Sequence, residues 1–354
     1  MSEFKKGGAE YITGLIEAAV KDGSRKATVC GKHEIASMIR IPSDFTLILD
    51  GCHLRMADGV FSNMFTNQSR ETEAAKKAAG ADRNISIIGK NNPILDGGNY
   101  NGLSEKTQLT GDYPEIWHNN LILFANVDGF EMRDFACHNQ RWWAINLYGC
   151  RNGKLDHIHF QACDLAVDDE GNLSHGLCRK ERNRVLVKNA DGIDLRRGCH
   201  HIEISNITGF TEDDTVALTN LYGRSEKHFG VEDLPDDICY VTIKNIKTAG
   251  FCSMVRLLNQ GGTKLHDIVI DGVEDVSAEC PYMDVGHYGV RIGDAKHMYG
   301  SRHSTKEETY NIVVRNVRSR AEAAVSLAGA VENLTLENIE GFDGAVSILD
   351  ERII

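Results

Sequence analysis

The sequence lacks several features that would place it in common protein classes. Its 354 residues include only 5 prolines and no apolar run long enough to cross a membrane. The stretch from Met1 to Val20 contains no continuous apolar segment of the signal-peptide kind. The chain lacks an excess of positive charge: it has 39 Lys and Arg and 51 Asp and Glu, which gives a formal net charge of −12. We therefore expect a cytoplasmic protein with no nucleic-acid partner and no membrane segment.

The ten cysteines have no Cys-x-x-Cys spacing, which argues against a zinc site. Without an export signal, buried reduced thiols are the simpler interpretation, although disulfides would return if a signal peptide had been removed. We expect no metal and no cofactor. Calcium stays open as an alternative, since stacked carboxylates can bind hard cations.

One short pattern recurs along the chain: alternating apolar residues that follow a small or polar residue and lead into Asn, Asp or Gly. Alternation with a period of two predicts strands with one buried face. The eight instances begin at Asn84, Gly129, Gly153, His201, Tyr240, Asp267, Asn311 and Asn333. Their starts therefore differ by 45, 24, 48, 39, 27, 44 and 22. We interpret three gaps as one period, three as two periods, and the gap of 39 as one period with an insertion at 221–236.

Strands this short, repeating at the single-period gaps of 22, 24 and 27, are typical of the coils of a parallel β-helix. Asn and Asp near the strand ends suit tight bends and can stack as a ladder between coils. Apolar residues at helical spacing predict a capping helix at 9–21, and 68–80 is a surface excursion that could be helical. The expected fold is all-β: a single-stranded parallel β-helix forming one domain over 1–354, with a helical cap at 1–26 and coils at 27–354.

Acidic residues cluster at two places one period apart. Asp191 and Asp213 are separated by 22 residues, so we expect them side by side on neighbouring coils, at roughly 4.8 Å strand spacing. Asp194 is expected on the same strand face as Asp191, and Asp214 adds a further carboxylate. Like charges this close raise at least one pKa, leaving one group protonated as a general acid while a neighbour activates water. Paired carboxylates of this kind hydrolyse glycosidic bonds.

Other side chains near these acids could hold a saccharide, through charge or through an aromatic face. Asp168 and Asp169 could be a third acidic cluster, but they fall in a charged stretch that looks like an inserted loop, and their role stays open. The candidate substrate-binding residues are Asp194, Arg197, Arg256, Arg291, Lys296 and Trp143.

The segment Asn-Ala-Asp-Gly-Ile-Asp at 189–194, followed by Glu-Asp-Asp-Thr-Val-Ala-Leu at 212–218, resembles the polygalacturonase family, glycoside hydrolase family 28. Members of that family carry Asn-Thr-Asp-Gly and then Gly-Asp-Asp. The resemblance implies a right-handed, pectin-lyase-like β-helix and inverting hydrolysis. It also implies that Asp213 is the general acid, that Asp191 and Asp214 hold and activate the water, and that Arg291 grips a uronate carboxylate.

The chain departs from the family pattern at several positions. Ala190 replaces Thr, Glu212 replaces Gly, and Gly293 replaces the Lys of an Arg-Ile-Lys motif. The family's Gly-His-Gly is missing, because the corresponding stretch at 251–254 reads Phe-Cys-Ser-Met. The acid–base residues are thus better preserved than the residues that would grip a uronate.

We therefore expect a glycosidase of the polygalacturonase type that acts on a short oligosaccharide, which could contain uronate. One alternative is a β-helix lyase or epimerase that removes the proton beside a uronate carboxylate. Another is a non-catalytic carbohydrate-binding β-helix whose acidic residues only form turns. The sequence does not indicate an oligomeric state.

Overall fold

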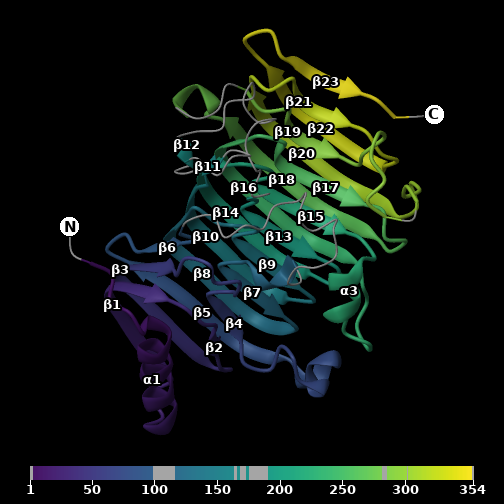
Figure 1. Cartoon of the computed structure of the whole chain (residues 1–354). Coiled ribbons are helices and arrows are strands. Elements are labelled where there is room, and N and C mark those ends of the chain that lie inside the picture. Colours follow the sequence, from purple (N-terminus) through teal and green to yellow (C-terminus); the bar gives the residue numbers. More distant parts are fainter. Residues whose placement is uncertain are drawn as a thin grey trace.

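Two parallel sheets run the length of the molecule in the computed structural model (Figure 1). The structure describes residues 3–98, 116–162, 166–167, 173–174, 190–280, 285–300 and 302–352. Sheet A consists of β1 (Lys26–Ile35), β3 (Phe45–Met56), β5 (Asp82–Lys90), β6 (Ile94–Asp96), β8 (Val127–His138), β10 (Arg151–Gln161), β14 (His200–Thr211), β16 (Ile238–Gly250), β18 (Leu265–Asp275), β20 (Thr309–Ser319) and β22 (Glu332–Gly341).

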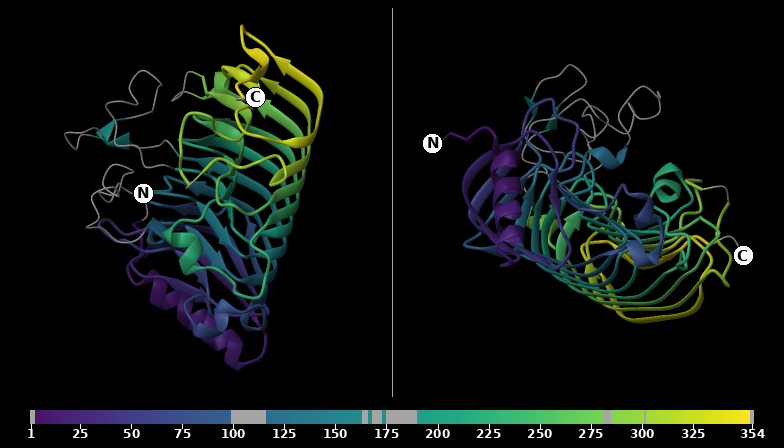
Figure 2. Two further views of the ribbon diagram at one scale, coloured as in Figure 1. Left: turned by 90° about the vertical axis from the view of Figure 1, so that its right-hand side faces the viewer. Right: turned by 90° about the horizontal axis from the view of Figure 1, so that it is seen from below.

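Sheet B is made of shorter strands, each of which follows a strand of sheet A along the chain. It consists of β2 (Ile39–Ile41), β4 (Phe65–Asn67), β7 (Ile122–Ala125), β9 (Ile145–Tyr148), β13 (Ile193–Arg196), β15 (Val216–Asn220), β17 (Ser253–Asn259), β19 (Tyr288–Ile292), β21 (Ala323–Leu327) and β23 (Val346–Asp350). A separate antiparallel pair, β11 (Ala166–Val167) and β12 (Leu173–Ser174), belongs to neither sheet. The chain winds between the two sheets and stacks coil upon coil, so the expected right-handed parallel β-helix is confirmed (Figure 2).

Apolar residues that alternate along the strands fill the interior of the solenoid. In β14, for example, Ile202, Ile204 and Ile207 join one continuous buried cluster. The helix α1 (Gly8–Lys21) places Ile12 and Ile16 in the same cluster at the N-terminal end. The predicted capping helix is thus confirmed, and its position is visible in Figure 1.

All eight instances of the sequence repeat lie in sheet A, but the interpretation of the long gaps was wrong. The instances at Asn84 and Gly129 fall in β5 and β8, which are neighbours in the sheet, so the gap of 45 is one coil. The gaps of 48 and 44 are likewise single coils, because β10 pairs with β14 and β18 pairs with β20. Insertions between the sheets lengthen the chain without disturbing the stacking of strands.

The gap of 39 was interpreted correctly. It contains an insertion with the short helix α3 (Arg224–His228). The excursion at 68–80 is helical in part, as the 3-10 helices η1 (Glu73–Lys76) and η2 (Ala78–Gly80).

Asparagine residues stack between coils, as the sequence suggested. Asn206, Asn245, Asn316 and Asn338 all have positive φ, a conformation that Asn tolerates better than most residues. Asn245 Nδ2 donates a hydrogen bond to Asn206 Oδ1 at 3.2 Å, and Asn338 Nδ2 donates to Asn316 Oδ1 at 3.0 Å. These bonds join equivalent bends of neighbouring coils and help to fix the register of sheet A.

Among the described cysteines, Cys52, Cys137, Cys150 and Cys199 are buried and have free thiols. None of the helices among the described residues is long and apolar enough to span a membrane.

Candidate active site

The acidic clusters meet at the start of two neighbouring strands of sheet B. Ile193 of β13 pairs with Val216 of β15, and the Gly192 amide donates a hydrogen bond to the Asp214 carbonyl at 3.0 Å. This register places Asp191 opposite Asp214. The predicted alignment of Asp191 with Asp213 was therefore off by one residue, because the coil is one residue longer than the assumed period. The clusters nevertheless come together, as expected.

Asp194 reaches the same site by a different route from the one predicted. It lies three residues after Asp191, so simple alternation would place the two on opposite faces. However, β13 begins only at Ile193, and Asp191 precedes the strand. Ile193 and Leu195 point into the core, which leaves Asp194 and Arg196 on the outer face of sheet B.

The four carboxylates interact electrostatically. Burial raises the pKa of Asp191 well above its ordinary value, and the charges of Asp194, Asp213 and Asp214 raise it further. Burial also raises the pKa of Asp194 to about 7, against the effect of Arg196. Burial raises the pKa of Asp214, whereas the charges of Arg256 and Arg291 and the hydrogen bond from Ser253 lower it. At neutral pH, therefore, this group of four carboxylates, which we call the acid cluster, retains at least one proton.

The raised pKa of Asp194 predicts a measurable pH dependence of stability. The folded protein holds a proton on Asp194 up to about pH 7, whereas the unfolded chain releases it near pH 4. Stability should therefore fall as pH rises from about 4 to about 7. Between pH 5 and pH 8, urea denaturation should show the wild type losing on the order of 2–3 kcal/mol relative to Asp194→Asn, since one pKa unit corresponds to about 1.4 kcal/mol. An equal pH slope in the two proteins would contradict this.

Arg196 connects the acid cluster to a buried carboxylate from the 221–236 insertion. Its Nη2 donates to Asp194 Oδ1 at 3.0 Å, and its Nη1 lies 3.6 Å from Glu226 Oε1. The guanidinium carbon stands 4.0 Å from the centre of the Trp143 ring. Although burial lowers it, Asp194 and Glu226 hold the pKa of Arg196 above its ordinary value. Sequence reasoning named Arg197 rather than Arg196, although alternation along β13 would have selected Arg196.

Two arginines stand on the other side of the acid cluster. Arg256 of β17 pairs in register with Arg291 of β19, and both side chains are buried. Asp294 contacts both arginines. Its Oδ2 accepts a hydrogen bond from Arg256 Nη2 at 3.1 Å, and its Oδ1 lies 3.2 Å from Arg291 Nη2. Asp294 was not selected from the sequence, although it lies three residues after Arg291. The two arginines form a compact positive site beside Asp214, which we call the arginine pair.

The backbone explains why position 293 cannot carry the Lys of the family motif. Gly293 has a φ of +77°, and a Cβ atom there would lie 2.3 Å from Gly329 Cα. A side chain at this position would clash with backbone and force an unfavourable conformation. Arg256 supplies a second cation from the preceding coil instead.

Two further residues near the acid cluster were missed in the sequence. Ser253 donates a hydrogen bond to Asp214 Oδ1 at 2.5 Å, from the stretch that replaces Gly-His-Gly. Partial burial raises the pKa of Tyr299 to about 12; Arg256 opposes this rise, and Asp294 and Asp213 add to it. Tyr299 therefore lies within electrostatic reach of both the acid cluster and the arginine pair. No short motif marks it in the sequence.

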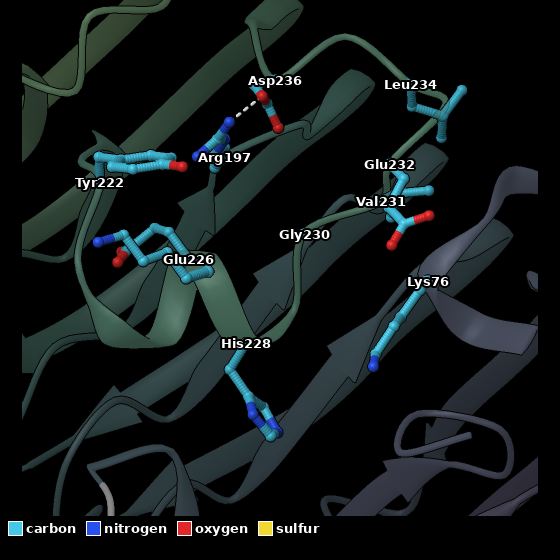
Figure 3. Close-up of a pocket in the computed structure, with 11 residues that line it drawn as sticks. Lys76, Arg197, Tyr222, Glu226, His228, Gly230, Val231, Glu232, Leu234 and Asp236 are labelled. Carbon is cyan, nitrogen blue, oxygen red and sulfur yellow. Dashed lines mark hydrogen bonds and ion pairs between the residues drawn. The ribbon is translucent and has the colours of Figure 1, made fainter. Parts of the chain in front are cut away.

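Three predicted substrate-binding residues do not join the acid cluster. Arg197 forms an ion pair with Asp236 and lies over the Tyr222 ring, in a separate pocket (Figure 3). Lys296 Nζ reaches Glu351 Oε1 at 3.0 Å, and only its backbone contributes to the site, by donating to Asp294. Trp143 is 5% exposed, and Arg196 covers its ring, so the ring supports Arg196 rather than offering a face to a sugar. Asp168 and Asp169 lie outside the described residues.

No group of three His, Cys, Asp or Glu side chains within the described ranges has an arrangement that could hold a metal ion. The acid cluster is accompanied by Arg196 and the arginine pair, whose positive charges compensate it. Such an arrangement of carboxyl and guanidinium groups has the chemistry to exchange protons.

Paired carboxylates of the kind gathered in the acid cluster are the catalytic groups of most glycoside hydrolases. The protein-family model described as "Glycosyl hydrolases family 28" matches residues 30–225, which is more than half of the chain. The chain therefore belongs to this family. It is a glycosidase of the polygalacturonase type. No curated protein matches the chain in sequence.

Solved structures support the fold. An exopolygalacturonase from Thermotoga maritima superposes with a TM-score of 0.56 at 13% identity, over 93% of this chain and 82% of that one. A galactohydrolase whose name specifies sulfated galactose and sulfated anhydrogalactose gives 0.60 at 11% identity, over 97% and 86%. A tailspike protein of E. coli bacteriophage HK620, solved with a pentasaccharide, gives 0.55 at 12%, over 97% and 61%. At these identities, the likeness shows a shared fold.

Proposed function

We propose that the protein hydrolyses a short, uronate-containing oligosaccharide with inversion at the anomeric carbon, in the cytoplasm. The observation that carries this proposal is the acid cluster, in which buried aspartates of two neighbouring coils lie opposite each other next to a pair of buried arginines. A carbohydrate-binding protein would need no such convergence, because turn-forming aspartates are normally hydrogen-bonded to nearby amides.

Within the cluster, we assign the general acid to Asp213. It is the most exposed of the four carboxylates, whereas Asp191, Asp194 and Asp214 are buried. A proton held by the cluster can therefore reach the leaving oxygen of a substrate most directly from Asp213. Asp191 and Asp214 lie opposite each other across the two strands and would hold and activate the water.

The arginine pair gives the proposal its substrate class. Both guanidinium groups are buried and share one carboxylate, Asp294, so the arginine pair keeps a net positive charge beside Asp214. Planar guanidinium groups bind carboxylates with paired hydrogen bonds, which a uronate can accept. A neutral sugar at the same position could not form these paired, charge-assisted hydrogen bonds.

The test is an assay of the purified protein on di-, tri- and tetragalacturonate and on neutral galacto-oligosaccharides of equal length. We expect reducing ends to appear with the galacturonates, and proton NMR should show the inverted anomer first. A product that absorbs in the near ultraviolet would indicate a lyase and refute hydrolysis. First appearance of the retained anomer would refute the assigned roles of Asp191 and Asp214.

A further inference from the structure

Two segments that interrupt the coil pattern meet in space, although they are far apart in the chain. One is the 68–80 excursion with η1 and η2, and the other is the 221–236 insertion with α3. The Glu232 amide donates to the Lys76 carbonyl at 2.7 Å, and the Ala78 amide donates to Asp233 Oδ1 at 2.6 Å. Insertions on one face of a solenoid often form its binding surface.

Contacts with the coils hold both segments in place. Asn126 Nδ2 donates to the carbonyls of Ala75 and Lys77, each at 2.8 Å. The Gly198 amide donates to the Asp236 carbonyl at 2.9 Å. Phe229 packs with Trp117 and Tyr148 in a buried cluster. The space between the segments therefore has walls that are formed before any ligand arrives.

That space is a pocket of about 520 Å³ (Figure 3). Three cations and three carboxylates line it, so its formal charge balances. Two of the cations contact the Tyr222 ring, with Arg197 Cζ 4.4 Å and Lys227 Nζ 4.8 Å from its centre. The charged lining residues are Lys76, Arg197, Lys227, Glu226, Glu232 and Asp236.

We propose that this pocket binds an uncharged sugar unit, as a second saccharide site beside the acid cluster. Its volume is in the range of small-molecule sites. Sugar hydroxyl groups both donate and accept hydrogen bonds, which suits a lining that mixes ammonium, guanidinium and carboxylate groups. An anionic sugar would gain no net attraction from a balanced lining, and an apolar ligand would strip water from charged groups without replacing it.

The pocket is linked to the acid cluster through one side chain. Glu226 lines the pocket wall, and its carboxylate also faces Arg196, which is hydrogen-bonded to Asp194. Glu226 Oε2 accepts hydrogen bonds from the Gly223 amide and the Ser225 hydroxyl, both at 3.0 Å, which fixes its position. The choice of a saccharide as ligand rests on the proposed function, and the sugar unit held here would belong to the same substrate at a distance from the bond that is cleaved.

The test is methyl NMR on the full-length wild-type protein, titrated with galactose, glucose, rhamnose and galacturonate. Val231 and Leu234 line the pocket and report on it, while Val346 and Ile348 are exposed on the last strand and serve as reference. We expect saturable shifts of the two pocket residues with at least one neutral sugar, at least fivefold weaker binding of galacturonate, and unmoved reference signals.

Two exposed side chains of the pocket provide the variants. Lys227→Gln and Glu232→Gln should each weaken binding of the neutral sugar at least fivefold, whereas Lys306→Gln, far along the chain in an exposed turn, should not. Absence of shifts with all neutral sugars, tighter binding of galacturonate, or unchanged binding in both pocket variants would overturn the proposal. Because binding is measured without cleavage, a protein that binds sugar here but hydrolyses nothing would refute the proposed function alone.

Discussion

Replacing Asp213 by Asn is expected to lower kcat on a galacturonate oligomer by about 10²–10⁴-fold, the usual contribution of a general acid. The substitution removes the most exposed carboxyl of the acid cluster, which is the proposed general acid, and changes the size of the side chain very little. Substrate binding should persist, because the arginine pair is untouched and its contacts run to Asp294. Steady-state kinetics of the wild type and the variant should therefore show the loss in kcat, with KM changed by less than threefold.

Asp343→Asn is the matched control, since Asp343 is an exposed aspartate with positive φ in a turn near the C-terminal end. It should leave kcat at the wild-type value. Hydrolysis that survives Asp213→Asn at more than a tenth of the wild-type rate would remove Asp213 as the acid. If kcat fell in Asp343→Asn as well, loss of folded protein would be the explanation, and circular dichroism of both variants would reveal it.

The solenoid was predictable because its signal is local and repeated. Each strand of sheet A carries its own alternation of apolar residues, and each bend carries its own Asn or Asp, so the pattern survives in every coil. The helix at 8–21 was equally clear from its apolar spacing. Most strands of sheet B were harder to see, because they are short and buried on both faces. β13 and β15, for example, contain no exposed residue.

The site was predictable only in outline. The repeat period correctly predicted which aspartates lie close together. It did not predict their register, because the coil is one residue longer than the period and Asp191 therefore lies opposite Asp214. Contacts made by the insertions could not be predicted from the sequence. Glu226 meets Arg196 only because the 221–236 insertion folds back over β13, and nothing in the spacing of the two residues indicates that contact.

Replacing Arg196 by Met is expected to destabilise the protein by about 3–5 kcal/mol at pH 8, the cost of leaving buried charges without a partner. Arg196 is 6% exposed, and it faces two carboxylates that are themselves buried, Asp194 and Glu226. Methionine fills similar volume against Trp143 but offers no positive charge. Urea denaturation should place the midpoint well below that of the wild type. Arg197→Met, whose partner Asp236 is partly exposed, should cost about 1 kcal/mol or less.

Two measurements can show whether Arg196→Met loses stability because buried charges are left unpaired or because packing is damaged: the pH dependence of stability, and the effect of removing the partner charges as well. Without Arg196, the pKa of Asp194 should rise further above its unfolded value, so the folded protein gains a proton and recovers part of its stability as pH falls from 8 to 5. Adding Asp194→Asn and Glu226→Gln to Arg196→Met should restore most of the lost stability at pH 8, because no uncompensated buried charge is left. If the triple variant is as unstable as Arg196→Met at pH 8, the guanidinium contributes through packing on Trp143, and the charge network linking the acid cluster to the 221–236 insertion carries no net free energy.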